Sequence, residues 1–104
     1  MSLLGIDIGS SSCKGVVFSV TGEVLASENH SYSALQNIGP SMVEIDAVTF
    51  RDAAFNVIRR LSARMKNDPI EALAISSHGE TTIPVDREGN TTGPAIMDSD
   101  NRAE

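Results

Sequence analysis

A single amphipathic stretch, residues 50–65, constrains the fold of this chain more than any other feature. Its apolar residues recur at helical spacing and form one face: Phe50, Ala54, Val57, Ile58, Leu61 and Met65. Asp46 and Thr49 lie just before this stretch and can each cap a helix. The Asn-Asp-Pro sequence at 67–69 ends it. The pattern therefore predicts one helix with strand-like segments on both sides.

Three strand-like segments precede the helix. Residues 3–8 indicate a buried strand, and residues 13–20 are rich in valine and phenylalanine. Thr21-Gly22 then predicts a two-residue turn into a third strand over 23–32, because glycine adopts positive φ without steric cost. We expect these three strands to be consecutive and antiparallel.

The remaining segments are shorter. Residues 34–45 lack periodicity and predict an extended loop. Residues 70–76 indicate a strand, and residues 81–86 a further one, with Pro84 at an edge or bulge. Residues 91–97 lead towards a last strand. The order β-β-β-α-β is that of an α/β, ribonuclease H-like fold with a mixed sheet.

The turn after the first strand carries the strongest chemical signal. Asp7 interrupts an apolar run, and Gly9 allows a sharp turn and close approach to a ligand. The hydroxyls and backbone N–H groups of residues 10–12 can donate to phosphate oxygens, while Lys14 can neutralise a phosphate. Asp7 would hold Mg²⁺, because a carboxylate repels phosphate directly. A serine-rich hairpin in which Asp7 only caps backbone N–H groups explains the same residues, and loop composition does not separate the two interpretations.

Charge and cysteine content limit the partners. The net charge of −6 argues against nucleic acid and anionic membrane surfaces, which require basic patches. One cysteine, Cys13, permits no internal disulfide and favours a reducing compartment. We find neither a signal peptide nor an apolar stretch near the ~20 residues of a membrane span. These features predict a cytoplasmic protein.

Three separated segments resemble the N-terminal domain of the FGGY family of carbohydrate kinases, which includes glycerol kinase, xylulokinase and gluconokinase. They are "GIDIGSSSCKGVVFSVTGEVLAS", "SMVEIDAVTF" and "ALAISSHGETTIPVDREGNTTGPAIMDSDNRA". Met42 and Asp98 depart from the pattern, since the family usually has tryptophan or a similar residue there. The resemblance covers nearly the whole chain and implies the fold of the actin and hexokinase superfamily.

The resemblance also implies a site for ATP and Mg²⁺. Asp7 would approach the metal and phosphates, and Lys14 would take the place of a phosphate-binding cation. The cofactor-binding residues would be Gly9, Ser10, Ser11, Ser12 and Lys14.

The third segment implies a substrate site. Glu80 resembles a carboxylate that hydrogen-bonds substrate hydroxyls, whereas Gly79 replaces the arginine of glycerol kinases. His78 would point into the same cleft, and Asp100 would bind substrate or organise its loop. The expected substrate is a small sugar or polyol.

In the family, the catalytic base and the adenosine pocket lie further along the polypeptide. We therefore expect residues 1–104 to form the first part of an N-terminal kinase domain, without the C-terminal domain and inactive alone. The substrate's identity and any homo-oligomer are left open.

Two alternatives remain. One is a non-catalytic binding or assembly module of the actin-like superfamily. The other is a ribonuclease H-type nuclease, in which Asp7, Glu44 or Asp46, and Asp86 or Asp100 form a two-metal carboxylate cluster.

Overall fold

The computed structural model describes residues 1–34 and 39–103. Within them lie one helix and six strands. Their bounds are β1 Ser2–Ile8, β2 Ser12–Ser19, β3 Val24–Ser31, β4 Glu44–Ile45, α1 Val48–Arg64, β5 Ile70–Ser77 and β6 Ala95–Ile96. Each of the four longer strands lies within one residue of its predicted position. Residues 35–38, part of the predicted 34–45 loop, lie outside the described residues.

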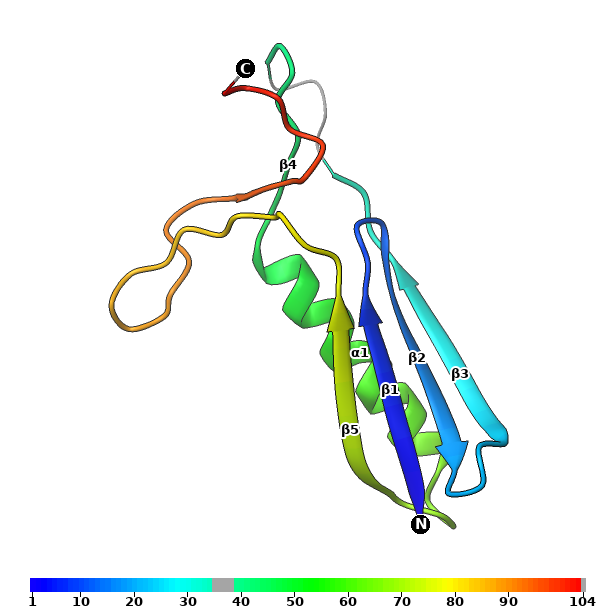
Figure 1. The fold of residues 1–104 in the computed structure, drawn as a ribbon. Helices are drawn as coiled ribbons and strands as arrows, with labels where there is room; N and C mark the ends of the chain where they lie inside the picture. Colours follow the sequence, from blue (N-terminus) through cyan, green and yellow to red (C-terminus); the bar gives the residue numbers. More distant parts are fainter. Residues whose placement is uncertain (35–38, 104) are drawn as a thin grey trace.

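The main sheet has the order β3-β2-β1-β5, and α1 lies across one of its faces (Figure 1). β1 pairs antiparallel with β2, and β2 with β3, while β5 runs parallel to β1. The connection from β3 to β5 passes over one face of the sheet and contains α1. This crossover allows β5 to run parallel to β1. This arrangement confirms the predicted mixed sheet and β-β-β-α-β order.

The core lies between α1 and the inner face of the sheet. α1 contributes the buried residues Phe50, Ala53, Val57 and Leu61. The strands contribute Leu4, Ile6, Cys13 and Val17, each no more than 2% exposed. Because successive strand residues point to opposite faces, the alternate residues of β1 and β2 face away from the helix.

β5 is less well covered than the other strands. α1 packs chiefly against β2 and β3. In β5, Ile70 is half-buried and every following residue is exposed. β5 is also the last strand of the sheet, so one of its edges is unpaired.

The predicted strand over 81–86 is wrong. Only two isolated bridges form there, one between Thr82 and Ile96 and one between Val85 and Thr91. Pro84 lacks an N–H group, and the segment leaves the main sheet to form an arm beside it (Figure 1). The predicted last strand is reduced to β6, which pairs antiparallel with β4 in a two-stranded sheet.

Two boundaries also differ from prediction. The β2–β3 loop spans residues 20–23, not two residues, and the pairing register of the two strands shifts between Val17 and Phe18. Gly22 has the expected positive φ of 92°. α1 begins at Val48, so Thr49 lies inside the helix, while Asp46 accepts a hydrogen bond from the Val48 N–H at 3.2 Å.

No helix in the described part of the chain is both long and apolar enough to cross a membrane.

Candidate functional site

The candidate phosphate loop, residues 9–12, is a tight turn between β1 and β2. The Gly9 N–H donates to the Ser12 carbonyl at 2.8 Å, which closes the turn. A Cβ at Gly9 would lie 3.0 Å from that carbonyl oxygen, so a side chain there would crowd the turn. Ser10 and Ser11 are exposed at the tip, and Ser12 is half-buried. The turn therefore presents two free hydroxyls at the end of the sheet.

Ser10 and Ser11 line a hollow of about 440 Å³ with segments that are distant in sequence. Polar groups on its other sides are Ser33, Asp98 and Ser99. The sequence of the loop does not predict that these three residues lie beside it. Their hydroxyls and carboxylate can donate to and accept from a polyhydroxylated ligand.

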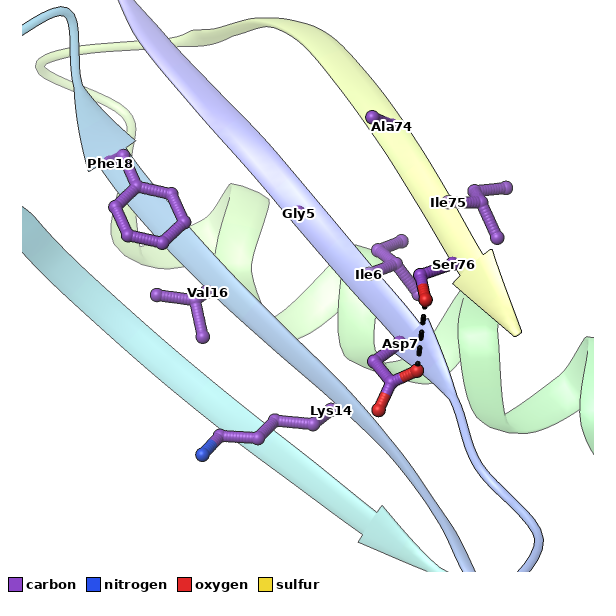
Figure 2. A pocket seen from close by; sticks show the side chains of 9 residues that line it. All are labelled: Gly5, Ile6, Asp7, Lys14, Val16, Phe18, Ala74, Ile75 and Ser76. Atoms are coloured by element: carbon purple, nitrogen blue, oxygen red, sulfur yellow. Dashed lines mark hydrogen bonds between the residues drawn. The ribbon is translucent and has the colours of Figure 1, made fainter. Parts of the chain in front are cut away.

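Asp7 and Lys14 lie directly opposite each other on β1 and β2. Both point to the face away from α1, where they border a second hollow of about 360 Å³ (Figure 2). Asp7 is exposed, and its Oδ1 accepts one long hydrogen bond from the Ser76 hydroxyl, at 3.4 Å. The carboxylate that interrupts the apolar run is thus on the open face of the strand. The structure brings Asp7 and Lys14 together on this face, whereas Ser10 and Ser11 line the other hollow.

The carboxylates of the nuclease hypothesis do not form a cluster. Among residues 1–34 and 39–103, no three His, Cys, Asp or Glu side chains gather in a way that could hold a metal ion. Glu44 and Asp100 pair with Arg102, and Asp86 accepts hydrogen bonds from its own turn at Glu88 and Asn90. A two-metal carboxylate site is therefore inconsistent with the arrangement of these residues.

His78 follows the carboxyl end of β5 and lies beside the end of β1. Its backbone N–H donates to the Ile8 carbonyl at 2.9 Å, and its Nδ1 lies 3.1 Å from the same oxygen. Because a carbonyl only accepts, Nδ1 carries a proton, and Nε2 is hydrogen-bonded to the Thr81 hydroxyl at 2.6 Å. Both ring nitrogens are thus engaged within the protein.

Gly79 and Glu80 are exposed at the start of the arm. Glu80 has a φ of 65°, which is unusual for a residue with a side chain. Both residues follow His78 in the sequence, and neither lines the hollow that contains Ser10 and Ser11.

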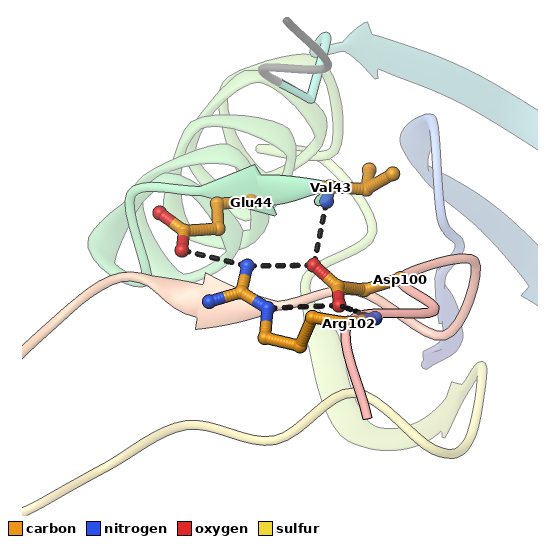
Figure 3. A network of polar contacts seen from close by, with 4 residues as sticks. All are labelled: Val43, Glu44, Asp100 and Arg102. Carbon is orange, nitrogen blue, oxygen red and sulfur yellow. Dashed lines mark hydrogen bonds and ion pairs between the residues drawn. The ribbon is translucent and has the colours of Figure 1, made fainter. Parts of the chain in front are cut away.

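Asp100 belongs to an ion-pair network that ties the segment after β6 to β4 (Figure 3). Its Oδ2 accepts from the Val43 N–H at 2.6 Å and lies 2.6 Å from a guanidinium nitrogen of Arg102. The same nitrogen lies 2.7 Å from Glu44. Hydrogen bonds from Arg102 hold the pKa of Asp100 well below its usual range. With a side chain only 1% exposed, Asp100 has no free surface in this structure for a substrate hydroxyl.

Tyr32 is a site residue that the sequence analysis did not single out. It follows β3, is buried, and lines the same hollow as Ser10 and Ser11. Its hydroxyl donates to the Gly9 carbonyl, and its N–H donates to the Ser11 carbonyl at 2.9 Å. Burial, followed by the nearby charges of Cys13 and Asp7, raises the pKa of Tyr32 to about 12. No local pattern around residue 32 predicts this contact, because the partner is 23 residues away.

Cys13 is fully buried in β2, as expected for a packed strand residue. Burial raises the pKa of its thiol, with a smaller contribution from Asp7. Both effects disfavour the reactive thiolate.

Residues 2–104 match the model of the FGGY family of carbohydrate kinases, N-terminal domain. A xylulose kinase of Staphylococcus xylosus is 30% identical over 101 residues, which are 96% of this chain and 20% of that protein. A gluconokinase of Bacillus subtilis (strain 168) is 30% identical over 102 residues, covering 98% of this chain and 20% of the relative.

The fold was also found in solved structures. The crystal structure of gluconate kinase from Lactobacillus acidophilus matches with a TM-score of 0.88 and 25% identity, over 96% of this chain and 20% of that chain. The present chain thus spans about a fifth of the length of the proteins it matches.

Proposed function

Because the chain belongs to the FGGY family of carbohydrate kinases, we propose that it supplies the phosphate loop of an ATP-dependent sugar or polyol kinase. The β1–β2 hairpin carries this proposal. It presents an exposed carboxylate, a lysine directly opposite, and two exposed serines at the turn. Asp7 and Lys14 border one hollow and the serines line another, and an ordinary structural hairpin requires none of these groups at this end of the sheet.

The residues fit a Mg²⁺-bound triphosphate. Mg²⁺ is usually held by one or two carboxylates together with substrate phosphates and water, so a single carboxylate such as Asp7 is sufficient. Lys14 takes part in none of the ion pairs found among the described residues and is available to a phosphate. Bound ATP would supply the transferable γ-phosphoryl group. Gly9, Ser10, Ser11 and Ser12 would orient it through backbone N–H and hydroxyl donors.

The substrate side of the proposal rests on residues 78–80. His78 and Glu80 come directly after β5, whose carboxyl end lies beside that of β1. Glu80 would accept hydrogen bonds from substrate hydroxyls, and His78 would hold this segment against Ile8. Gly79 has no side chain to contact a small triol, so we favour a sugar or a larger polyol over glycerol. Asp100 would act indirectly, by fixing the segment after β6 beside the hollow that contains Ser10 and Ser11.

Phosphoryl transfer depends mainly on positioning, which can lower a barrier by roughly 7–11 kcal/mol. The described residues can position phosphates and hydroxyls. We assign the proton-accepting base and the adenosine pocket to polypeptide outside residues 1–104, and expect the 104-residue chain alone to be inactive. As in the sequence analysis, we place this activity in the cytoplasm.

Nucleotide binding can be tested on the chain itself. Amide shifts of the ¹⁵N-labelled chain would be recorded during titration with Mg²⁺-ATP and with Mg²⁺-tripolyphosphate. We expect changes concentrated at residues 9–14, and their loss in Asp7→Asn and Lys14→Ala. Lys66→Ala, which removes an exposed cation at the end of α1, serves as the matched control. Changes spread evenly over the chain, or confined to α1, would contradict the proposal.

Catalysis is tested by ADP release from the full-length gene product that carries this chain, with polyols, pentuloses and sugar acids as acceptors. Turnover that is lost in Asp7→Asn supports the kinase and identifies its substrate. A full-length protein that binds ATP but is silent on every acceptor would favour the alternative, a non-catalytic assembly module.

A further inference from the structure

Tyr32 connects the candidate phosphate loop to the end of β3 by two hydrogen bonds. The hydroxyl reaches the carbonyl of Gly9, the first residue of the turn, and the backbone N–H reaches the carbonyl of Ser11. The turn's own hydrogen bond joins Gly9 to Ser12. In the described residues, the side chains of Ser10 and Ser11 make no hydrogen bond within the protein. The direction of the turn is therefore set largely by these backbone anchors.

The ring of Tyr32 begins a row of three aromatic side chains. It packs edge-on against Phe50 with 5.2 Å between ring centroids and an interplanar angle of 87°. Phe50 lies in the first turn of α1 and in turn contacts the His78 ring, with a centroid separation of 5.6 Å. His78 is bonded to Ile8 and Thr81. The row thus runs from the phosphate loop to the segment assigned to substrate.

We propose that Tyr32 is a positioning residue that holds the phosphate loop in a fixed orientation relative to residues 78–81. This inference rests on the proposed function for its biological meaning, but the positioning itself is a property of the fold. With the Gly9 and Ser11 carbonyls fixed, the N–H groups and hydroxyls at the tip keep one direction towards the hollow. Donors that are already oriented lose less conformational entropy when a phosphate binds.

This role can be tested with one substitution, because Tyr32 is the only tyrosine of the chain. The first measurement is amide hydrogen exchange in Tyr32→Phe, which keeps the ring and removes the hydroxyl. The Gly9 amide reports on the turn, because its own hydrogen bond to the Ser12 carbonyl closes it. We expect this amide to exchange roughly 3- to 10-fold faster, because loss of the hydrogen bond from Tyr32 to the Gly9 carbonyl makes opening of the turn easier by about that factor. The amides of Leu4 and Ile6, in the buried part of β1, should exchange at the wild-type rate.

Asn56→Ala is the matched control. It removes the 2.6 Å side-chain contact between Asn56 and His30, which also joins α1 to the end of β3 but does not touch the loop. The Gly9 amide should be unaffected in this variant. Equal acceleration at Gly9, Leu4 and Ile6 in Tyr32→Phe would show general destabilisation and overturn the proposal, as would no acceleration at Gly9.

The second measurement separates this proposal from the function. Binding of Mg²⁺-tripolyphosphate to the wild type and to Tyr32→Phe would be measured by the amide shifts of residues 9–14. If the probe binds the wild type, we expect weaker binding in Tyr32→Phe. Binding that is equal in both proteins overturns the positioning role. If the probe does not bind the wild type, the proposed function fails, while the exchange data still decide the role of Tyr32.

Discussion

Asp7 and Asp100 are both aspartates, but their carboxylates differ in exposure and in hydrogen bonding. Asp7 is exposed and makes one long hydrogen bond to Ser76, which leaves its charge available to a ligand. Asp100 is enclosed by Arg102 and the Val43 N–H, so its charge is neutralised within the protein. The sequence context alone does not predict this difference, because Asp7 lies between two isoleucines and Asp100 lies in a polar segment, yet Asp7 is the exposed carboxylate.

The lowered pKa of Asp100 makes its contribution to stability depend on pH. A carboxyl group with a lowered folded-state pKa stabilises the protein above its unfolded value, here 3.8, and loses this contribution as pH falls towards the folded value. Asp100→Asn should therefore lower the Tm at neutral pH. We expect the Tm difference from wild type to shrink as the pH is lowered below about 4, as followed by circular dichroism.

The control for this prediction is Asp52→Asn. Asp52 is 65% exposed and, within residues 1–34 and 39–103, forms an ion pair only with its neighbour Arg51, so its removal should change the Tm little at any pH. A Tm difference for Asp100→Asn that stays constant down to the acid transition would contradict the ionic role of this residue.

At the scale of elements, the contact between α1 and β2 depends on Gly15. An added Cβ at this position would lie 2.5 Å from Val57 Cγ1 and 2.7 Å from Leu61 Cδ1. The helix can approach the sheet this closely because β2 has no side chain there. Val57 and Leu61 are at most 1% exposed and have no room to move away.

Gly15→Ala should consequently destabilise the fold by about 1–3 kcal/mol, the usual cost of overpacking a core. Urea unfolding would measure this as a lower midpoint with an unchanged slope. Gly5→Ala in β1 is the matched control, because its Cβ would lie 3.8 Å from the Phe18 ring, an ordinary contact. Wild-type unfolding midpoints for both variants would contradict the close packing of α1 against β2 at Gly15.

At the scale of the whole molecule, the structure is extended. Its radius of gyration is 16.0 Å, whereas a compact domain of this size has about 13 Å. The arm extends away from the sheet (Figure 1), and the surface around β5 is open. On that strand Leu73 and Ile75 are 49% and 60% exposed, and on α1 Phe55 is 55% exposed.

This apolar surface should bind hydrophobic dyes and promote self-association of the 104-residue chain. Ile75→Lys should lower the fluorescence of bound anilinonaphthalene sulfonate and shift sedimentation towards the monomer. The free energy of unfolding should change by no more than about 0.5 kcal/mol, because the side chain is exposed. Val24→Lys on β3, where the valine is 65% exposed, provides the control and should have a smaller effect on both measurements. Equal effects of the two substitutions would show that β5 is not the associating surface.

The sequence by itself determined the order of the four long strands and the helix, and the family. Strand and helix patterns depend on neighbouring residues, so the alternation in residues 3–8 and the helical spacing in 50–65 were sufficient to locate β1 and α1. The candidate phosphate loop could be recognised for the same reason, since Asp7, Gly9 and the serines are close together in the sequence. Family membership followed from three such local motifs in the right order.

Only the tertiary structure decided how these parts are used. Residues 81–86 have a strand-like composition but leave the main sheet, because pairing depends on which edge is within reach. Tyr32 meets Gly9 across 23 residues, and Asp100 meets Val43 across 57. Contacts of this kind are set by the packing of α1 and the register of the strands, and a local pattern does not encode either. The sequence therefore specified the chemical groups of the site, while the fold specified which are free to bind a ligand and which hold the others in place.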